Sequence, residues 1–282
     1  MVSDAPRYRG MDAAEIERQY NFRAMVPGHG AVIARWTEDS TAARRSPNAL
    51  LDIPTGPHPR QRLDLFPAGD GAPLLAFVHG GYWRALSKDI FAVLAAPFVA
   101  RGVSVALIGY GLCPDVTFET LIGHVRGGVD WLFEHGAEHG VDPTRIVLSG
   151  HSAGGHLTAL LASESDSRLA GGLCLSGIYD LEALRLFSGN VDLKLDGPTA
   201  QRLSPLNRVP EGTAPPLVLA LGGEESPEMH RQQADYAAAW MQRGHEVRTL
   251  VEPDADHFTA VDRLADPSTP LFAAALDLLG VR

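Results

Sequence analysis

Short apolar segments separated by longer helical patterns constrain the fold of this chain more than any other feature. The strand candidates are residues 61–66, 73–80, 103–110, 145–151, 171–179, 215–223 and 245–253. Helical patterns cover residues 87–101, 117–139, 153–164, 227–243 and 268–279. Strands that are apolar almost throughout and alternate with helices are typical of a parallel sheet buried on both faces. The sequence therefore predicts an α/β fold with a mostly parallel central sheet flanked by helices on both faces.

No feature of the sequence divides the chain. Its 282 residues are enough for one large α/β core, and they contain no internal repeat, low-complexity tract or second core. We therefore predict a single domain over residues 1–282, in which residues 1–60 form an N-terminal extension. Residues 9–24 are expected to form a helix, followed by a polar loop to about residue 60.

Composition excludes several classes of protein. A net charge of −10 and the lack of any Lys/Arg run argue against a nucleic-acid-binding surface. The N-terminal segment is too polar for a signal peptide, and no apolar run approaches the roughly 20 residues that span a bilayer. The only cysteines, Cys113 and Cys174, lie among apolar residues without metal-type spacing and are expected to be reduced core thiols. We expect a cytoplasmic protein without membrane or nucleic-acid partners.

Residues 150–154, GHSAG, lie where a strand candidate meets a helical pattern. Ligands bind at the carboxyl ends of the strands in open parallel sheets, so this junction is a place to look for chemistry. The G-x-S-x-G spacing between a strand and a helix is typical of a nucleophile elbow, a sharp turn that raises the serine hydroxyl above the sheet. Ser152 is therefore predicted to be a catalytic nucleophile. The alternative is a tight glycine turn in which Ser152 only caps the helix.

A serine nucleophile needs a base, and His257 is the best candidate among 11 histidines. His257 lies in a polar loop after the last strand candidate, where the chain order serine, acid, histidine places the base. His230 lies on a helical pattern and His245 begins a strand candidate. His79 and His156 flank glycine turns, where packing or hydrogen bonding is the simpler role.

His135 and His139 are four residues apart on a predicted helix, a spacing that can hold a metal ion. They lack both a glutamate directly after the first histidine and a third ligand, so a solvent-facing pair is favoured. No metal and no cofactor are predicted.

Three carboxylates could orient the base. Glu224 and Glu225 follow one strand candidate, and Asp180 follows the preceding one. The two glutamates could equally form the solvated start of the next helix, where negative charge suits the helix dipole. Position after a strand does not separate these candidates.

Residues 79–83, HGGYW, form a glycine turn with two large aromatic side chains after another strand candidate. Acyl transfer produces an oxyanion that needs preorganised N–H donors, one of them from the residue after the nucleophile. The backbone N–H groups of Gly81, Tyr82 and Ala153 are predicted to form this oxyanion hole. Tyr82 and Trp83 are expected to line the pocket wall, although Trp83 alone could equally be an ordinary core residue.

Taken together, these segments resemble the α/β-hydrolase superfamily, and within it the kynurenine formamidase (arylformamidase) and bacterial esterase group. The shared motifs are HGGYW at 79–83, GHSAGG at 150–155, SG at 176–177, DL at 180–181, ESPEMHRQ at 225–232 and DHF at 256–258. In that group the acid directly precedes the Ser-Pro-Glu run, which corresponds here to Glu225. The resemblance implies a triad of Ser152, Glu225 and His257, with Phe258 joining the aromatic side chains that contact substrate.

The resemblance also implies a function. Members of the group hydrolyse aryl formamides or simple carboxylic esters through an acyl-enzyme, and their motifs do not separate the two reactions. The expected partner is therefore a small ester or formamide; a homodimer is left open. A general short-chain carboxylesterase and a non-catalytic binding module on the same fold are the alternatives. The segment 180–215, where larger hydrolases insert a lid, is short, so the N-terminal extension is expected to cover part of the pocket.

Overall fold

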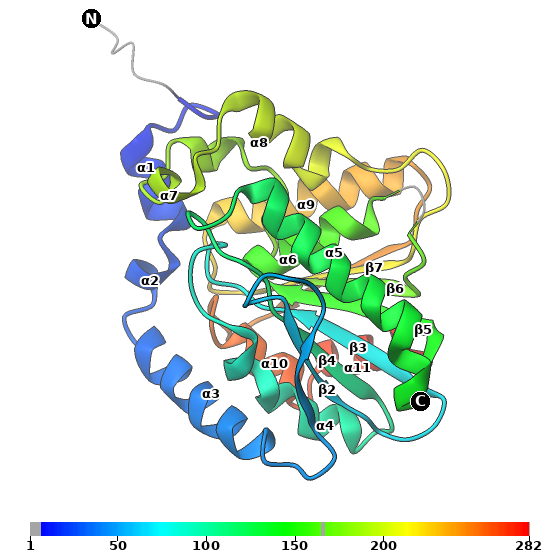
Figure 1. Ribbon diagram of the computed structural model, residues 1–282. Coiled ribbons are helices and arrows are strands. Elements are labelled where there is room, and N and C mark those ends of the chain that lie inside the picture. The colour runs from blue at the N-terminus through cyan, green and yellow to red at the C-terminus, as the bar shows by residue number, and fades with distance from the viewer. Residues whose placement is uncertain (1–6, 165–166, 282) are drawn as a thin grey trace, which may run out of the picture.

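A single sheet organises the computed structural model, which describes residues 7–164 and 167–281 (Figure 1). Within those residues eight strands pair in the order β1-β2-β4-β3-β5-β6-β7-β8. Their bounds are Leu50–Pro54 (β1), Arg62–Phe66 (β2), Ala72–Val78 (β3), Ser104–Ile108 (β4), Val141–His151 (β5), Gly171–Leu175 (β6), Leu217–Gly222 (β7) and Val247–Glu252 (β8). β1 and β2 are antiparallel to their neighbours, and every other pair is parallel. The predicted mostly parallel sheet is confirmed.

Helices cover both faces of the sheet, as predicted (Figure 1). One layer contains α5 (Phe118–His135), α6 (Ala153–Ala162) and α9 (Pro227–Gln242). The opposite layer contains α4 (Ala95–Val99), α10 (Ala260–Ala265) and α11 (Pro270–Leu278). The rings of Phe98 on α4 and Phe272 on α11 lie 4.5 Å apart between their centroids. One short 3₁₀ helix, η1 (Lys88–Leu94), leads directly into α4, and another, η2 (Gly136–His139), directly follows α5.

The strand at one edge of the sheet, β1, was not predicted. Seven strand candidates correspond to β2 through β8, whose central members are buried along their whole length. β1 instead pairs with β2 alone, is largely exposed, and contains Asp52 at φ 57°. An exposed edge strand lacks the apolar signal by which a buried strand is recognised.

The N-terminal extension is more helical than expected. The helix predicted at 9–24 is α1 (Ala13–Tyr20) followed by α2 (Phe22–Met25), and the predicted loop contains α3 (His29–Ala43). Asn21 separates the first two helices because its side chain accepts a hydrogen bond from the N–H of Ala24 and so caps α2. The prediction of a loop to residue 60 is therefore wrong, and residues 1–6 of the extension lie outside the described residues.

Residues 13–43, which we call the N-terminal strap, run along one side of the molecule from α9 to α10 (Figure 1). At one end the Tyr20 hydroxyl lies 3.1 Å from Glu228 Oε2 and accepts from Gln232 Nε2 at 2.6 Å. At the other end Trp36 Nε1 donates to Asp262 Oδ1 at 2.7 Å. Tyr20 and Trp36 are almost completely buried, so these contacts hold the strap against the core.

Between β6 and β7 the chain forms only short helices. They are η3 (Glu182–Arg185), α7 (Asn190–Leu193), α8 (Gly197–Leu203) and η4 (Pro205–Asn207). This segment agrees with the predicted short lid. Both Cys113 and Cys174 are free and buried, as expected. Among the described residues no helix has the combined length and apolar character needed to cross a bilayer.

Candidate active site

Ser152 lies at the sharp turn between β5 and α6. Its backbone has φ 57° and ψ −116°, in the left-handed region that side-chain-bearing residues rarely adopt. Two glycines allow the turn to pack closely against its neighbours. A Cβ at Gly154 would lie 1.9 Å from the carbonyl oxygen of Val78, and one at Gly80 would lie 2.9 Å from that of His151. The glycines of both sequence motifs are thus required by close backbone approach.

Three predicted residues, Ser152, His257 and Glu225, come together above the sheet although they are far apart in sequence. Ser152 Oγ lies 3.0 Å from His257 Nε2, and His257 Nδ1 lies 2.6 Å from Glu225 Oε2. An ionised carboxylate only accepts hydrogen bonds, so Nδ1 carries the hydrogen and Nε2 is free to accept from the hydroxyl. Such a chain can move a proton from a serine hydroxyl to an imidazole.

Glu225 is buried and surrounded by donors. Its Oε1 accepts from the Gly222 N–H at 3.0 Å and from the hydroxyl of Ser176, and its Oε2 accepts from His257. Burial opposes ionisation, yet the charge and hydrogen bond of His257 and the Ser176 and Gly222 donors hold the pKa of Glu225 below its usual value. The Glu225 carboxylate is therefore ionised next to the His257 imidazole, which needs a negatively charged partner when it takes up a proton.

The other carboxylates do not contact His257. Glu224 is exposed, and Asp180 accepts a hydrogen bond of 2.6 Å from the Tyr8 hydroxyl. The alternative bases are also occupied elsewhere, since His230 Nε2 faces the Gly223 carbonyl and His245 Nε2 faces that of Pro210. Geometry thus distinguishes Glu225 from its neighbour in a way that sequence position could not.

Three buried histidines other than the predicted base, His79, His151 and His156, are held neutral by burial. Burial lowers the pKa of His79 to about 4 and that of His156 to about 4. Burial, followed by the charge of His257, lowers the pKa of His151 to about 3. No group of three or more potential metal ligands occurs in the described part of the chain, and His135 pairs with Glu138 at 3.2 Å.

The backbone N–H groups predicted for the oxyanion hole have no protein acceptor in the described part of the chain. Within residues 7–164 and 167–281, those of Gly81, Tyr82 and Ala153 donate to no protein acceptor. Ala153 begins α6, so its N–H also lies at the positive end of the helix dipole. Gly81 has φ 109°, and a Cβ there would lie 2.2 Å from the carbonyl oxygen of Ala85. These free donors can bind an oxygen that gains negative charge.

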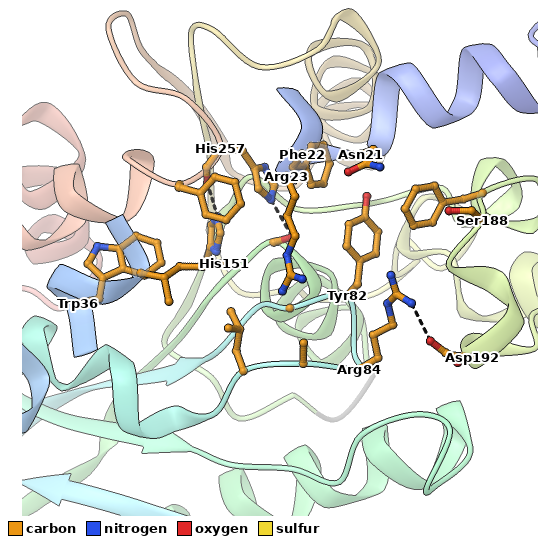
Figure 2. A pocket seen from close by; sticks show the side chains of 17 residues that line it. Asn21, Phe22, Arg23, Trp36, Tyr82, Arg84, His151, Ser188, Asp192 and His257 are labelled. Atoms are coloured by element: carbon orange, nitrogen blue, oxygen red, sulfur yellow. Dashed lines mark hydrogen bonds and ion pairs between the residues drawn. The ribbon is translucent and has the colours of Figure 1, made fainter. Parts of the chain in front are cut away.

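A cavity of about 370 Å³ opens beside Ser152 (Figure 2). Trp36 lies on one side of it, and Tyr82, Arg84, Ser188 and Asp192 lie on the other. The remaining lining residues are Asn21, Phe22, Arg23, Ile33, Gly81, Ala85, Leu86, His151, Phe187, His257 and Phe258. Most of this lining is apolar or aromatic, which is typical of a small-molecule site.

Aromatic rings form a stacked row that begins at His257. The Phe22 ring lies 3.6 Å from the His257 ring and 5.6 Å from the Tyr82 ring, and Tyr82 lies 4.9 Å from Phe187. All three pairs are stacked, with interplanar angles of 22°, 17° and 23°. Since Phe22, Tyr82 and Phe187 also line the cavity, a planar group bound next to Ser152 would meet an aromatic wall.

Of the three residues predicted to contact substrate, two line the cavity and one does not. Tyr82 and Phe258 line the cavity, but Trp83 is fully buried and packs against Phe118 and His156. Trp83 therefore occupies the core position that was its alternative.

Several residues of the site were not assigned a role from the sequence. Phe22 and Arg23 reach the cavity from the strap, and Phe187 reaches it from the short segment after β6. Ser176 belongs to a recognised motif, but nothing in the sequence indicated that its hydroxyl contacts Glu225.

Comparison with protein families yields two matches. A family model described as the prolyl oligopeptidase family matches residues 124–268, just over half of the 282-residue chain, and one described as BD-FAE matches residues 65–178. The first match includes Ser152, Glu225 and His257, and the second includes the glycine turn at 79–83. Together they identify the chain as an α/β-hydrolase.

Individual relatives are hydrolases. Kynurenine formamidase of Salmo salar is 28% identical, with the alignment covering 97% of this chain and 99% of that protein. Esterase LipQ of Mycobacterium tuberculosis is 30% identical over 84% of this chain and 63% of its own length. A crystal structure of a candidate thioesterase from a Silicibacter species superposes with a TM-score of 0.80 at 29% identity, covering 92% of this chain and 98% of that one.

Proposed function

Since this hydrolase belongs to the prolyl oligopeptidase family of the α/β-hydrolases, we propose that it cleaves a carboxylic ester or an aryl formamide through an acyl-enzyme on Ser152. The observation that carries the proposal is the chain of two hydrogen bonds, 3.0 Å from Ser152 to His257 and 2.6 Å from His257 to Glu225. That chain ends beside three backbone N–H groups without protein acceptors.

In the proposed mechanism His257 Nε2 takes the proton of Ser152 while Oγ attacks the carbonyl carbon. Glu225 stabilises the imidazolium that forms and keeps its ring in the correct tautomer. The N–H groups of Gly81, Tyr82 and Ala153 bind the oxyanion. His257 then gives the proton to the leaving amine or alcohol, and a water molecule hydrolyses the acyl-enzyme by the same steps in reverse order.

Aryl formamides are the favoured substrates within this class. Phe22, Tyr82 and Phe187 line the cavity and give it an aromatic wall against which an aryl leaving group can pack. The full-length similarity to kynurenine formamidase supports the same class, with N-formylkynurenine as the type substrate. A formyl group is the smallest acyl group, so it fits any acyl site that an acetyl group fits.

A general short-chain carboxylesterase is the second candidate, supported by the similarity to LipQ. Both candidates use the same serine, base and oxyanion site, so only substrates distinguish them. A non-catalytic binding module is disfavoured because such a protein would have no use for a complete proton-transfer chain at an accessible cavity.

The test combines a variant with a substrate panel. Ser152→Ala should fold normally and lose activity by about 10⁴- to 10⁶-fold. The wild-type kcat/KM is then measured for N-formylkynurenine and for p-nitrophenyl esters from acetate to decanoate. We expect kcat/KM to fall steeply beyond about four acyl carbons, because each methylene that does not fit costs about 1–3 kcal/mol. Substantial turnover by Ser152→Ala contradicts the covalent mechanism, and N-formylkynurenine cleaved much more slowly than the acetate favours the esterase.

A further inference from the structure

Within the described residues, the cavity contains one cationic side chain without a partner, Arg23 of α2. Among the residues that the structure describes, no carboxylate pairs with its guanidinium and no hydrogen bond engages it. The other arginine of the cavity, Arg84, donates to Asp192 at 2.7 Å. Figure 2 shows this contrast, with Arg84 joined to Asp192 and the Arg23 side chain extending from α2 across the cavity.

Among the described side chains that line the cavity, the charge of Arg23 alone is not compensated, while the Glu225 carboxylate lies behind His257 and outside the lining. Arg84 and Asp192 compensate each other, so the charge of Arg23 remains. Glu17, the nearest acidic residue of the strap, accepts from the side chains of Asn21 and Ser188 and does not line the cavity. The chain as a whole carries a net charge of −10, which repels anions at long range. A local cation can nevertheless bind an anion once the anion lies inside the cavity.

Arg23 lies on the side of the site where the leaving group departs. His257 donates its proton to the leaving group, so that group must lie next to the His257 imidazole. Phe22, the residue before Arg23, stacks on that imidazole at 3.6 Å between ring centroids. Arg23, Phe22 and His257 line the same cavity, so a leaving group next to His257 lies in the space that Arg23 also borders.

From this geometry we propose that Arg23 is a specificity-determining residue that binds a carboxylate on the leaving group. The inference rests on the proposed function and narrows its substrate class to aryl formamides or aryl esters whose aryl part carries an anionic side chain. The ring lies against the stacked aromatic rings, and the carboxylate accepts from the guanidinium, whose planar fork matches a carboxylate.

The test uses two substrates that differ only in charge. One is the phenyl acetate with a para propanoate side chain, and the other is the same acetate with the corresponding primary amide. The two methylene groups keep the reactivity of the two esters similar. The measured quantity is the ratio of kcat/KM for the anion to kcat/KM for the amide, which cancels any general change in activity.

Arg23 is solvent-exposed, so wild-type protein should prefer the anion by about three- to fivefold, the effect of one partly screened ion pair. Arg23→Gln should abolish this preference, mostly through KM, and Arg23→Lys should retain part of it because the charge remains. Raising the salt concentration to about 0.5 M should reduce the wild-type ratio. Arg101→Gln is the matched control, because Arg101 is exposed and lies outside the cavity. Its ratio should equal that of the wild type.

Several outcomes overturn the proposal. They are an unchanged ratio in Arg23→Gln, an equal loss in Arg101→Gln, and a preference that appears only when the carboxylate is moved to the acyl side, as in an aryl monoester of succinate. If wild-type protein cleaves neither of these esters nor N-formylkynurenine, the proposed function is wrong. Calorimetric titration of Ser152→Ala with 3-phenylpropanoate and with 3-phenylpropanamide then still decides the role of Arg23. Tighter binding of the anion that is lost in Ser152→Ala/Arg23→Gln supports it, and equal binding refutes it.

Discussion

Replacing Ser176 with alanine removes one of the three donors that hold Glu225. Ser176 is buried at the end of β6, and its N–H donates to the Ala220 carbonyl at 2.7 Å. Because β6 and β7 fix this backbone, the loss is confined to the hydroxyl. Glu225 keeps its hydrogen bonds to the Gly222 N–H at 3.0 Å and to the His257 imidazole at 2.6 Å. Without the Ser176 hydroxyl, however, its carboxylate is held less firmly in the orientation that faces His257.

The expected loss follows from the type of hydrogen bond. A hydrogen bond to a charged group contributes about 1.5–3 kcal/mol, and each 1.36 kcal/mol is a factor of ten in rate. If the whole free energy of this hydrogen bond stabilised the transition state, its loss would lower kcat about 10- to 100-fold. Since two donors remain on Glu225, we expect the lower end, about tenfold.

The assay measures kcat and KM with p-nitrophenyl acetate, together with the melting temperature. Ser176 does not line the cavity, so kcat should fall while KM stays the same. Ser204→Ala is the matched control, because Ser204 is also buried and bonds Leu181 N at 2.8 Å and Ala200 O at 2.7 Å. It should lower stability without lowering kcat. An unchanged kcat in Ser176→Ala, or an equal loss of kcat in the control, would refute the reasoning.

Other perturbations test the remaining parts of the site. Glu225→Gln should lower kcat about 100-fold or more through loss of imidazole orientation, whereas Glu224→Gln should lower kcat roughly twofold at most. The reverse ranking would show that Glu225 is not the acid that orients His257. Phe22→Leu should lower kcat several-fold with little change in melting temperature, because it removes the ring stacked on His257 but keeps the apolar cover. The pKa of buried His156, lowered from 6.5 to about 4, predicts acid sensitivity. The unfolded chain binds the proton first, so the contribution of His156 to stability is full above pH 6.5 and falls by about 2 kcal/mol at pH 5. His79 and His151, whose pKa values burial lowers to about 4 and about 3, add to the fall. Urea unfolding at pH 7 and pH 5 measures the fall, and equal stabilities would contradict it.

Sequence patterns predicted the features of this protein that are local in the chain. Buried strands such as β3 are recognisable because each residue faces a helix layer and is therefore apolar. This apolar run can be identified in the sequence without knowing which strand pairs with it. The turn at Ser152 is recognisable for the same reason, since its glycines lie two residues away on either side. Chain order then restricts the base to the last loop, where His257 lies.

Features that depend on contacts between distant segments could not be derived from the residue pattern, and Glu225 was selected only through the family resemblance. Glu224 and Glu225 are adjacent, and only the turn after β7 exposes one and directs the other toward Gly222 and Ser176. Trp83 follows Tyr82 directly, yet it packs into the core while its neighbour lines the cavity. In each pair the residue types are similar, and the backbone direction decides which side chain reaches the site.

The N-terminal strap covers part of the cavity, contacts the proposed catalytic base and contains the residue proposed to select the substrate. α2 places Phe22 on the His257 ring and Arg23 at the cavity, and it is held by buried contacts on either side, Tyr20 to α9 and Trp36 to α10. A helix of four residues has little stability of its own, so its position depends on these anchors. Loosening either anchor should therefore disturb the imidazole and the guanidinium together.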